Sequence, residues 1–221
     1  MRGVLEDWRL RLERVVAARP GADPAHDIGH LRRVWGLALR IAGRDRPEAD
    51  RLVLLAASYL HDLVNVPKDS PERHLASRRS AAEAVGILNR LGFPPDRLEA
   101  VRHAIEAHSF SAGIAPESPE AEILRDADRL DALGAIGLAR LFAISGVMGR
   151  RILDPDDPFA RMRPLDDVAF ALDHVRTKLE RLPGSMCTPT GKALAARRWA
   201  FVRRYLDRLR TELEEAREER R

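Results

Sequence analysis

The chain has 221 residues, 45% of them hydrophobic, which is enough to bury one substantial core. Its 38 basic and 34 acidic residues give a formal net charge of +4, a mild excess that is compatible with a polyanionic small molecule but does not predict a nucleic-acid partner. No apolar run approaches the roughly 18 residues of a membrane span, and residues 1–19 lack the unbroken apolar stretch of a secretory signal. The single cysteine, Cys187, excludes an internal disulfide. We therefore expect a soluble, cytoplasmic protein with no membrane partner.

Hydrophobic residues recur at helical spacing along most of the chain, and no extended alternating run is typical of a strand. The last helix is expected to begin at Thr188-Pro189, because threonine caps a helix well and proline fits its first turn. No break is sharp enough to divide the chain, so we expect an all-α protein with a single domain. In chain order, the pattern predicts helices over residues 4–16, 31–42, 52–63, 81–91, 98–108, 123–133, 134–147 and 168–182, and from 188 onward.

Three segments between the predicted helices are expected to be loops: Val66–Glu72, Ser109–Pro119 and Arg151–Leu165. The third is the longest, and a loop of that length is either a lid over a site or an excursion on the surface. The tail at 203–221 carries seven arginines and six acidic residues. Such a mixture of signs at helical spacing predicts a solvated helix face rather than a nucleic-acid surface.

The adjacent pair His61–Asp62 closes the most apolar of the predicted helices. A carboxylate at the end of such a helix is costly to bury without a compensating cation, so the pair predicts either a metal site or an ion pair. His30 lies one predicted helix upstream, on the same face as His26. By itself, a histidine near a helix start is an ordinary surface or core residue.

Three carboxylates follow within six residues, at Asp126, Asp128 and Asp131. The last two can share a helix face, where they bind a metal or pair with the neighbouring Arg125 and Arg129. Two imidazoles and two carboxylates together suit a divalent metal of borderline hardness, and we expect one ion of Mn, Fe, Co, Ni, Zn or, less well, Mg. A metal held in this way keeps open positions for water and a phosphate oxygen.

Several motifs join these residues into one pattern. They are His26-Asp27-x-x-His30-x-x-Arg33-Val34, His61-Asp62, His108-Ser109-Phe110-Ser111, the run from Asp126 to Gly137, and a C-terminal stretch around His174, Lys178-Leu179 and Thr190-Gly191-Lys192. The pattern resembles the HD-domain metal-dependent phosphohydrolase superfamily, in particular its small, bacterial, single-domain branch. The resemblance covers nearly the full chain. It implies one all-α helical bundle over residues 1–221, with a metal core at 26–134 and C-terminal helices at 166–217.

Carried over residue by residue, the resemblance implies that four side chains bind the metal, with Asp126 as the main competitor for the fourth position. The implied ligands are His30, His61, Asp62 and Asp128. We expect His61, Asp62 and His108 to take part in catalysis, where His108 contacts a phosphate or transfers a proton. Some relatives use an acid three residues after the HD aspartate for acid–base work, but this chain has Asn65 there.

Further residues are expected to support the ligands or to contact the substrate. A histidine ligand usually donates its second N–H to a carboxylate or carbonyl, so we expect His26, Asp27, Arg33 and Asp126 to orient the ligands. Asp27 is equally well placed to cap its helix. We expect substrate contacts from Lys68, Arg78, Arg79 and His103, and the alternative for each of them is an ordinary solvated side chain.

The resemblance implies a metal-dependent phosphohydrolase acting on nucleotides, including nucleoside or deoxynucleoside triphosphates cleaved to monophosphate and pyrophosphate. The first alternative is a phosphomonoesterase or cyclic-nucleotide phosphodiesterase that uses the same site. The second is a non-catalytic module of helices that senses nucleotides or binds nucleic acid. In the leading interpretation the partner is a small phosphate ester or nucleotide, and the pattern predicts no particular oligomeric state.

Overall fold

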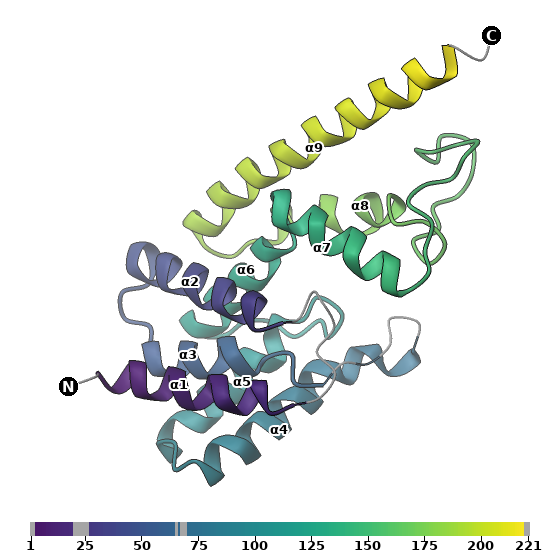
Figure 1. Ribbon diagram of the computed structural model, residues 1–221. Coiled ribbons are helices and arrows are strands. Elements are labelled where there is room, and N and C mark those ends of the chain that lie inside the picture. Colours follow the sequence, from purple (N-terminus) through teal and green to yellow (C-terminus); the bar gives the residue numbers. More distant parts are fainter. Residues whose placement is uncertain (1–2, 20–26, 65, 67–69, 219–221) are drawn as a thin grey trace. The chain divides into compact units, whose positions relative to one another are not determined.

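The computed structural model describes residues 3–19, 27–64, 66 and 70–218. Within these residues the protein consists of α-helices and short 3-10 turns, and its single β-type pairing is an isolated bridge between Arg151 and Phe170. This arrangement confirms the all-α prediction (Figure 1). The helices are α1 (Val4–Ala17), α2 (Ile28–Asp45), α3 (Arg51–Leu60), α4 (Ala76–Arg90), α5 (Leu98–His108), α6 (Pro119–Asp131), α7 (Gly134–Val147), α8 (Asp173–Thr177) and α9 (Pro189–Glu218).

The chain gathers into two compact units. The first comprises Met1–Arg129 with Met186–Gly191, and the second comprises Leu130–Ser185 with Lys192–Arg221. The expectation that residues 1–221 form a single domain stays a prediction.

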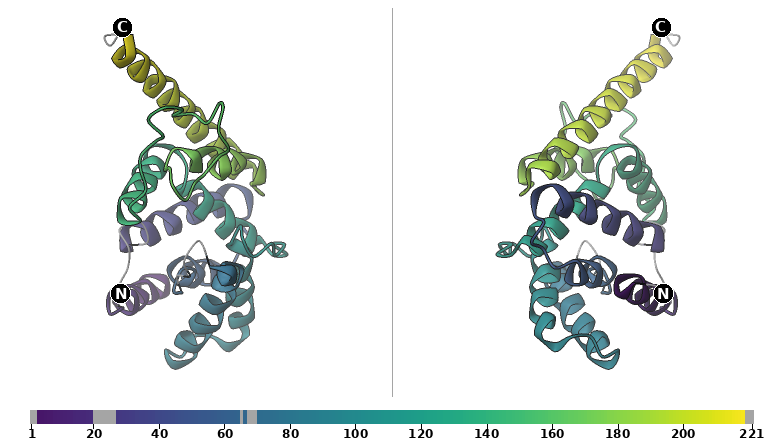
Figure 2. Two further views of the ribbon diagram at one scale, coloured as in Figure 1. Left: turned by 90° about the vertical axis from the view of Figure 1, so that its right-hand side faces the viewer. Right: turned by 90° about the vertical axis from the view of Figure 1, so that its left-hand side faces the viewer.

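Helix α3 lies at the centre of the first unit, because every residue after Arg51 is buried. It packs against α1, α2 and α5, and α4 runs beside α5 (Figure 2). The side chain of Asp50 caps α3 by accepting hydrogen bonds from the N–H groups of Leu52 and Val53, at 2.8 and 3.2 Å. The predicted helix over 52–63 therefore exists, but it ends at Leu60, so that His61 and Asp62 leave its last turn.

The predicted helix over 168–182 is wrong. The N–H groups of Ala171 and Leu172 donate to the carbonyls of Arg151 and Ile152, at 2.8 and 2.9 Å, instead of to carbonyls four residues earlier. The carboxylate of Asp166 accepts from two further N–H groups of the same segment. These partners leave only α8 and a 3-10 turn at Leu179–Arg181 in helical form.

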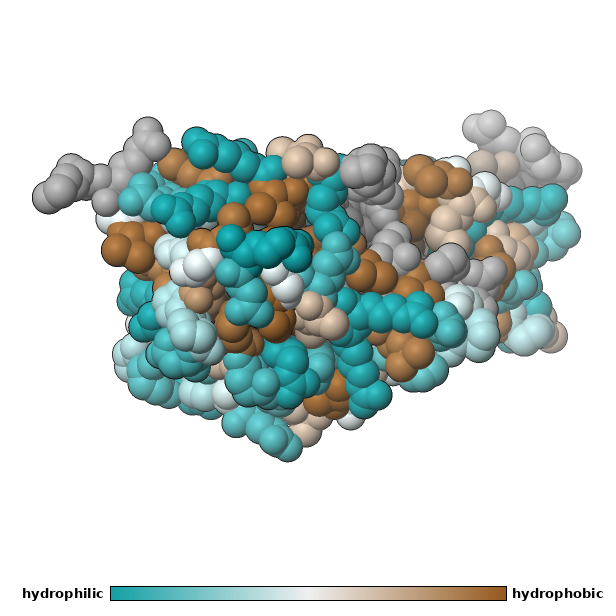
Figure 3. Space-filling model, turned by 90° about the horizontal axis from the view of Figure 1, so that it is seen from below, coloured by the Kyte–Doolittle hydropathy of each residue, from teal (hydrophilic) through white to brown (hydrophobic). Residues whose placement is uncertain are grey.

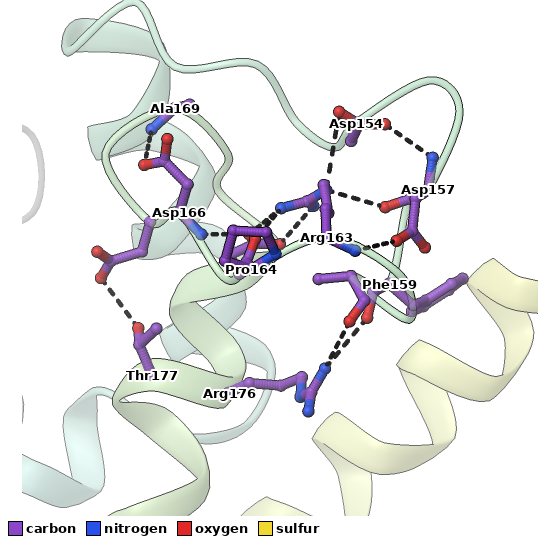
Figure 4. Close-up of polar contacts among 12 residues, drawn as sticks. Asp154, Asp157, Phe159, Arg163, Pro164, Asp166, Ala169, Arg176 and Thr177 are labelled. Atoms are coloured by element: carbon purple, nitrogen blue, oxygen red, sulfur yellow. Dashed lines mark hydrogen bonds and ion pairs between the residues drawn. The ribbon is translucent and has the colours of Figure 1, made fainter.

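The segment between α7 and α8 is a loop, as predicted, and its polar side chains bind its own backbone. The carboxylate of Asp157 accepts from three backbone N–H groups, at 2.7 to 3.1 Å. Arg163 donates to both oxygens of Asp173, at 2.6 and 2.9 Å, and its guanidinium lies 4.4 Å from the ring centroid of Phe170. Figure 4 shows Arg163 between Asp157 and Asp166 in this loop. The loop is therefore an ordered part of the second unit.

The surface alternates between polar and apolar side chains. On the face seen in Figure 3, hydrophobic residues form small groups separated by hydrophilic ones. No single helix of the described residues is both long and apolar enough to cross a bilayer, although α6 and α7 taken together meet both criteria.

Candidate metal centre

Four elements of the first unit bring polar side chains to one place. His30 lies in the first turn of α2, where the Asp27 carboxylate caps the helix by accepting from the His30 N–H at 2.8 Å. His61 is the C-cap residue of α3 and Asp62 follows it. His108 is the last residue of α5, and Asp128 lies in α6.

The atoms of these residues that can bind a metal converge. The two Nε2 atoms of His30 and His61 are 3.3 Å apart, and Oδ1 of Asp128 lies 3.7 Å from each of them. Oδ2 of Asp62 lies 3.4 Å from Nε2 of His61 and 3.8 Å from Nε2 of His30. Side chains from distant parts of the chain therefore face a common point.

His108 lies beside the second carboxylate oxygen of Asp62. Its Nε2 lies 3.7 Å from Oδ1 of Asp62. Two overlapping groups result, His30–His61–Asp128 and His61–Asp62–His108, and within each the potential ligand atoms lie within 4.8 Å of one another. His61 belongs to both groups, which makes it the central residue of the cluster.

The backbone sets the orientation of two imidazoles. Nδ1 of His61 lies 3.0 Å from the carbonyl oxygen of Ser58, and Nδ1 of His108 lies 2.5 Å from that of Ile105. A carbonyl oxygen only accepts, so each Nδ1 carries the proton and each Nε2 turns toward the cluster. These carbonyl partners were not predicted from the sequence. Each carbonyl belongs to the residue three positions before its histidine, but this spacing becomes informative only once the ends of α3 and α5 are known.

The carboxylates and the His61 imidazole shift one another's pKa values. Burial alone would lower the pKa of His61, but the carboxylates of Asp62 and Asp128 raise it to about 10. Burial in turn favours the neutral form of Asp128, but its contact with His61 holds the pKa of this carboxyl well below its usual range. A divalent cation would therefore compete with a proton for Nε2 of His61 and for the two carboxylates.

The donor set fits a divalent metal. Imidazole nitrogens and carboxylate oxygens together suit Mn, Fe, Co, Ni and Zn. The imidazoles of His30 and His61 are completely buried, whereas the side chains of Asp62 and Asp128 are 31% and 27% exposed. The open side of the cluster is therefore the carboxylate side, where a ligand from solvent can enter.

Asp126 does not join the cluster. Its oxygens accept hydrogen bonds from the N–H groups of Cys187 and Thr188, both at 2.8 Å, and from the Thr188 hydroxyl at 2.7 Å. Asp126 therefore holds the segment that leads into α9. The geometry favours Asp128 over Asp126 for the fourth ligand position.

The residues expected to orient the ligands do not share one position in the structure. Asp27 caps α2 and thereby fixes the backbone of His30, a residue predicted to bind the metal. A Cβ atom at Gly29 would lie 3.1 Å from Oδ1 of Asp27 and 3.3 Å from Nη1 of Arg33, so both side chains close over this glycine. His26 lies outside the described residues.

The described contacts of the residues expected to bind substrate do not reach the cluster. Arg78 and Arg79 are exposed on α4, and Arg79 pairs with Glu72 at 2.8 Å. Nε2 of His103 accepts from the Glu117 N–H at 2.9 Å, so it holds the loop between α5 and α6. Lys68 and Asn65 lie outside the described residues.

Comparisons with known proteins point to one family. The family model described as HD domain matches residues 27–133, a span that contains all four residues predicted to bind the metal. The chain is 30% identical over 192 residues to the uncharacterized protein YpgQ of Bacillus subtilis, and the match covers 85% of this chain and 84% of YpgQ.

Solved structures resemble the chain over nearly its full length. A Lactobacillus plantarum protein is 29% identical, with a TM-score of 0.73, and the match covers 97% of this chain and 100% of that one. YpgQ in complex with ADP is 29% identical, with a TM-score of 0.70 and coverage of 92% and 97%. An HD-superfamily hydrolase from Bacillus thuringiensis is 27% identical, with a TM-score of 0.69 and coverage of 95% and 96%.

Proposed function

The chain belongs to the HD-domain family, and we propose that it is a metal-dependent phosphohydrolase that cleaves nucleoside or deoxynucleoside triphosphates to a monophosphate and pyrophosphate. The observation that carries the proposal is the convergence of His30, His61, Asp62 and Asp128, whose facing nitrogen and oxygen atoms lie 3.3 to 3.8 Å apart. The crystal structure of YpgQ with ADP supports a nucleotide as the substrate class.

In this proposal His30, His61, Asp62 and Asp128 hold one divalent ion. The ion, when bound, would lower the pKa of a water molecule and offset the negative charge of phosphate oxygens. The buried His61 imidazole offers only Nε2, because its Nδ1 proton is bound by the Ser58 carbonyl. The carboxylates of Asp62 and Asp128 provide the charge that retains a cation, and their exposed side admits the phosphate chain.

His108 has the geometry of a residue that contacts the reacting phosphate or transfers a proton. Its Nδ1–H is bound by the Ile105 carbonyl, so Nε2 is the atom that exchanges a proton. Nε2 lies 3.7 Å from Asp62 Oδ1, so this nitrogen faces the cluster. In our proposal His108 donates a proton from Nε2 to the leaving phosphate oxygen. This assignment supplies an acid–base group in place of the acid that some relatives carry where this chain has Asn65.

The proposal is tested with a panel of nucleoside and deoxynucleoside triphosphates, each incubated with Mn²⁺, Mg²⁺, Co²⁺, Ni²⁺ or Zn²⁺. Separate detection of pyrophosphate and orthophosphate identifies the bond that breaks. His61→Ala and Asp62→Ala are compared with His74→Ala, which removes an exposed histidine outside the cluster. Metal content of each purified protein is measured by mass spectrometry, and helical content by circular dichroism.

We expect pyrophosphate release by the wild-type protein and by His74→Ala, and loss of both turnover and metal from the two cluster variants with helical content retained. If orthophosphate is the first product, the protein is a phosphomonoesterase and the proposal is wrong. If only cyclic nucleotides are cleaved, it is a phosphodiesterase. Equal metal content in wild type and His61→Ala, with no turnover in either, would favour a non-catalytic module.

A further inference from the structure

Phe110 is an aromatic side chain of the first unit that the fold leaves in solvent. It is 46% exposed, whereas Tyr59, Trp8 and Phe93 of the same unit are buried. Among the described residues of this unit, Val4 at the start of α1 is the other large hydrophobic side chain with comparable exposure. Exposure of an aromatic ring forgoes the free energy of burying it, and here it leaves nearly half of the side chain accessible to a ligand.

Two connections link the Phe110 ring to the helices that carry residues of the metal centre. Phe110 follows His108 by two residues, and Nε2 of His108 lies 3.7 Å from Asp62. The guanidinium carbon of Arg129 lies 5.4 Å from the centroid of the Phe110 ring, and Arg129 directly follows Asp128 in α6. The ring is thus linked to the end of α5 by the chain and to α6 by its contact with Arg129.

Arg129 supports the ring from the protein side. It is only 6% exposed, so its guanidinium contacts the ring from within the protein. A cation within about 6 Å of an aromatic centroid attracts the electrons of the ring face, which restricts the orientation of the ring. The part of the ring that Arg129 does not cover remains available to a ligand in solvent.

The loop that carries Phe110 is held at several points. Arg125 donates from Nε to the carbonyl of Ala107 at 3.1 Å and from Nη2 to that of Ile114 at 2.7 Å. The N–H of Glu117 donates to His103 at 2.9 Å. A ring presented by such a restrained loop loses little conformational entropy when a flat ligand stacks on it.

We propose that Phe110, supported by Arg129, is the stacking platform for the base of the nucleotide whose phosphates reach the metal centre. This inference rests on the proposed nucleotide function and extends it to specificity. Every base has a π face, so the platform discriminates nucleotides from phosphate compounds without a base and discriminates weakly among bases.

The test compares ADP with inorganic pyrophosphate as ligands, titrated by calorimetry in the presence of Mn²⁺. The variants are Phe110→Ala, Phe110→Leu, which keeps an apolar side chain without a π face, and Phe110→Trp, which keeps the π face. Phe201→Ala is the matched control, because it removes a phenylalanine that is 39% exposed on α9. Circular dichroism checks that each variant is folded, and turnover of nucleoside triphosphates is recorded for all proteins.

We expect Phe110→Ala and Phe110→Leu to weaken ADP binding about 5- to 150-fold, as loss of one base–aromatic stack does. Pyrophosphate affinity should change less than about twofold, a factor equivalent to under about 0.5 kcal/mol. Phe110→Trp and Phe201→Ala should bind ADP as the wild type does.

Three outcomes separate the two proposals. Unchanged ADP affinity in Phe110→Ala, with nucleotide turnover by the wild type, overturns the platform and leaves the proposed function in place. Parallel loss of ADP and pyrophosphate binding also overturns it, because the effect is then independent of the base. Selective loss of ADP binding in a protein that turns over no nucleotide supports the platform and overturns the proposed catalytic function.

Discussion

Gly191 and Asp126 lie so close together that a Cβ atom on the glycine would be 2.2 Å from Oδ2 of the aspartate. The same carboxylate accepts hydrogen bonds from the backbone of Cys187 and Thr188, so the start of α9 rests directly on α6. Asp126 is completely buried, and it lies only two residues before Asp128 of the proposed metal centre. The absence of a side chain at residue 191 therefore permits this contact.

Gly191→Ala should lower the free energy of unfolding by about 1–3 kcal/mol, the typical cost of forcing an extra group into a packed site. The control is Gly36→Ala in α2, where an added Cβ meets nothing within 4 Å. That change should raise the free energy of unfolding by up to about 1 kcal/mol, because alanine is the better helix former. Urea unfolding followed by circular dichroism measures both. Equal effects of the two changes would contradict the contact.

Asp126→Asn should lower stability and Asp128→Asn should lower metal affinity, although both residues are in α6. Asp126→Asn replaces an accepting oxygen by an amide NH₂ that faces backbone N–H groups, so this variant should lose about 1–3 kcal/mol of stability and keep its metal. Asp128→Asn should lose metal affinity because it removes a negative charge beside His30 and His61. Metal titration and urea unfolding of both variants give the answer. Metal loss confined to Asp126→Asn would reverse the assignment.

Glu13 in α1 connects three helices and should make stability depend on pH. Both of its oxygens accept from Arg32 of α2 at 2.9 Å, and one also accepts from Tyr59 of α3 at 2.9 Å. The contact with Arg32, followed by those with Tyr59 and Arg9, lowers the pKa of Glu13 from 4.5 to about 2. The stabilisation is therefore complete above pH 4.5 and disappears as the pH falls to about 2.

The variant that isolates this effect is Glu13→Gln, with the exposed Glu48→Gln as control. We expect the difference in unfolding free energy between wild type and Glu13→Gln to be about 1–3 kcal/mol at neutral pH, since the carboxylate is mostly shielded from solvent. The difference should shrink as the pH is lowered from 4.5 to 2. A difference that stays constant over this range would show that the charge of Glu13 contributes nothing.

Arg163→Lys should loosen the loop between α7 and α8. Lysine replaces a planar fork by a single ammonium group, so the paired contact with Asp173 and the stacking on Phe170 are both weakened. Hydrogen exchange measured by mass spectrometry should become faster by about tenfold or more over residues 154–166, because loss of about 1.4 kcal/mol corresponds to a tenfold change. Arg161→Lys, at an exposed position of the same loop, should leave exchange unchanged.

Much of the secondary structure follows from local patterns. The apolar spacing predicts α5 and α7 with their observed bounds, because helix formation depends on residues three or four apart. The segment at 168–172 has similar composition but is not helical. Its backbone instead binds residues 151 and 152, and such a partner distant in sequence has no local signal.

The sequence by itself determined the chemistry of the candidate site, since the histidines and aspartates with metal-binding character are readable one by one. Only the tertiary structure decided which of them meet. Asp126 and Asp128 are two residues apart in one helix, so they point in directions about 200° apart, and the packing of α6 directs Asp128 to the histidines and Asp126 to the start of α9. The same packing turned His103 toward the loop and left Phe110 exposed beside Arg129. The chemical character of a side chain is a property of each residue, whereas the distance between two side chains depends on contacts between helices that are far apart along the chain.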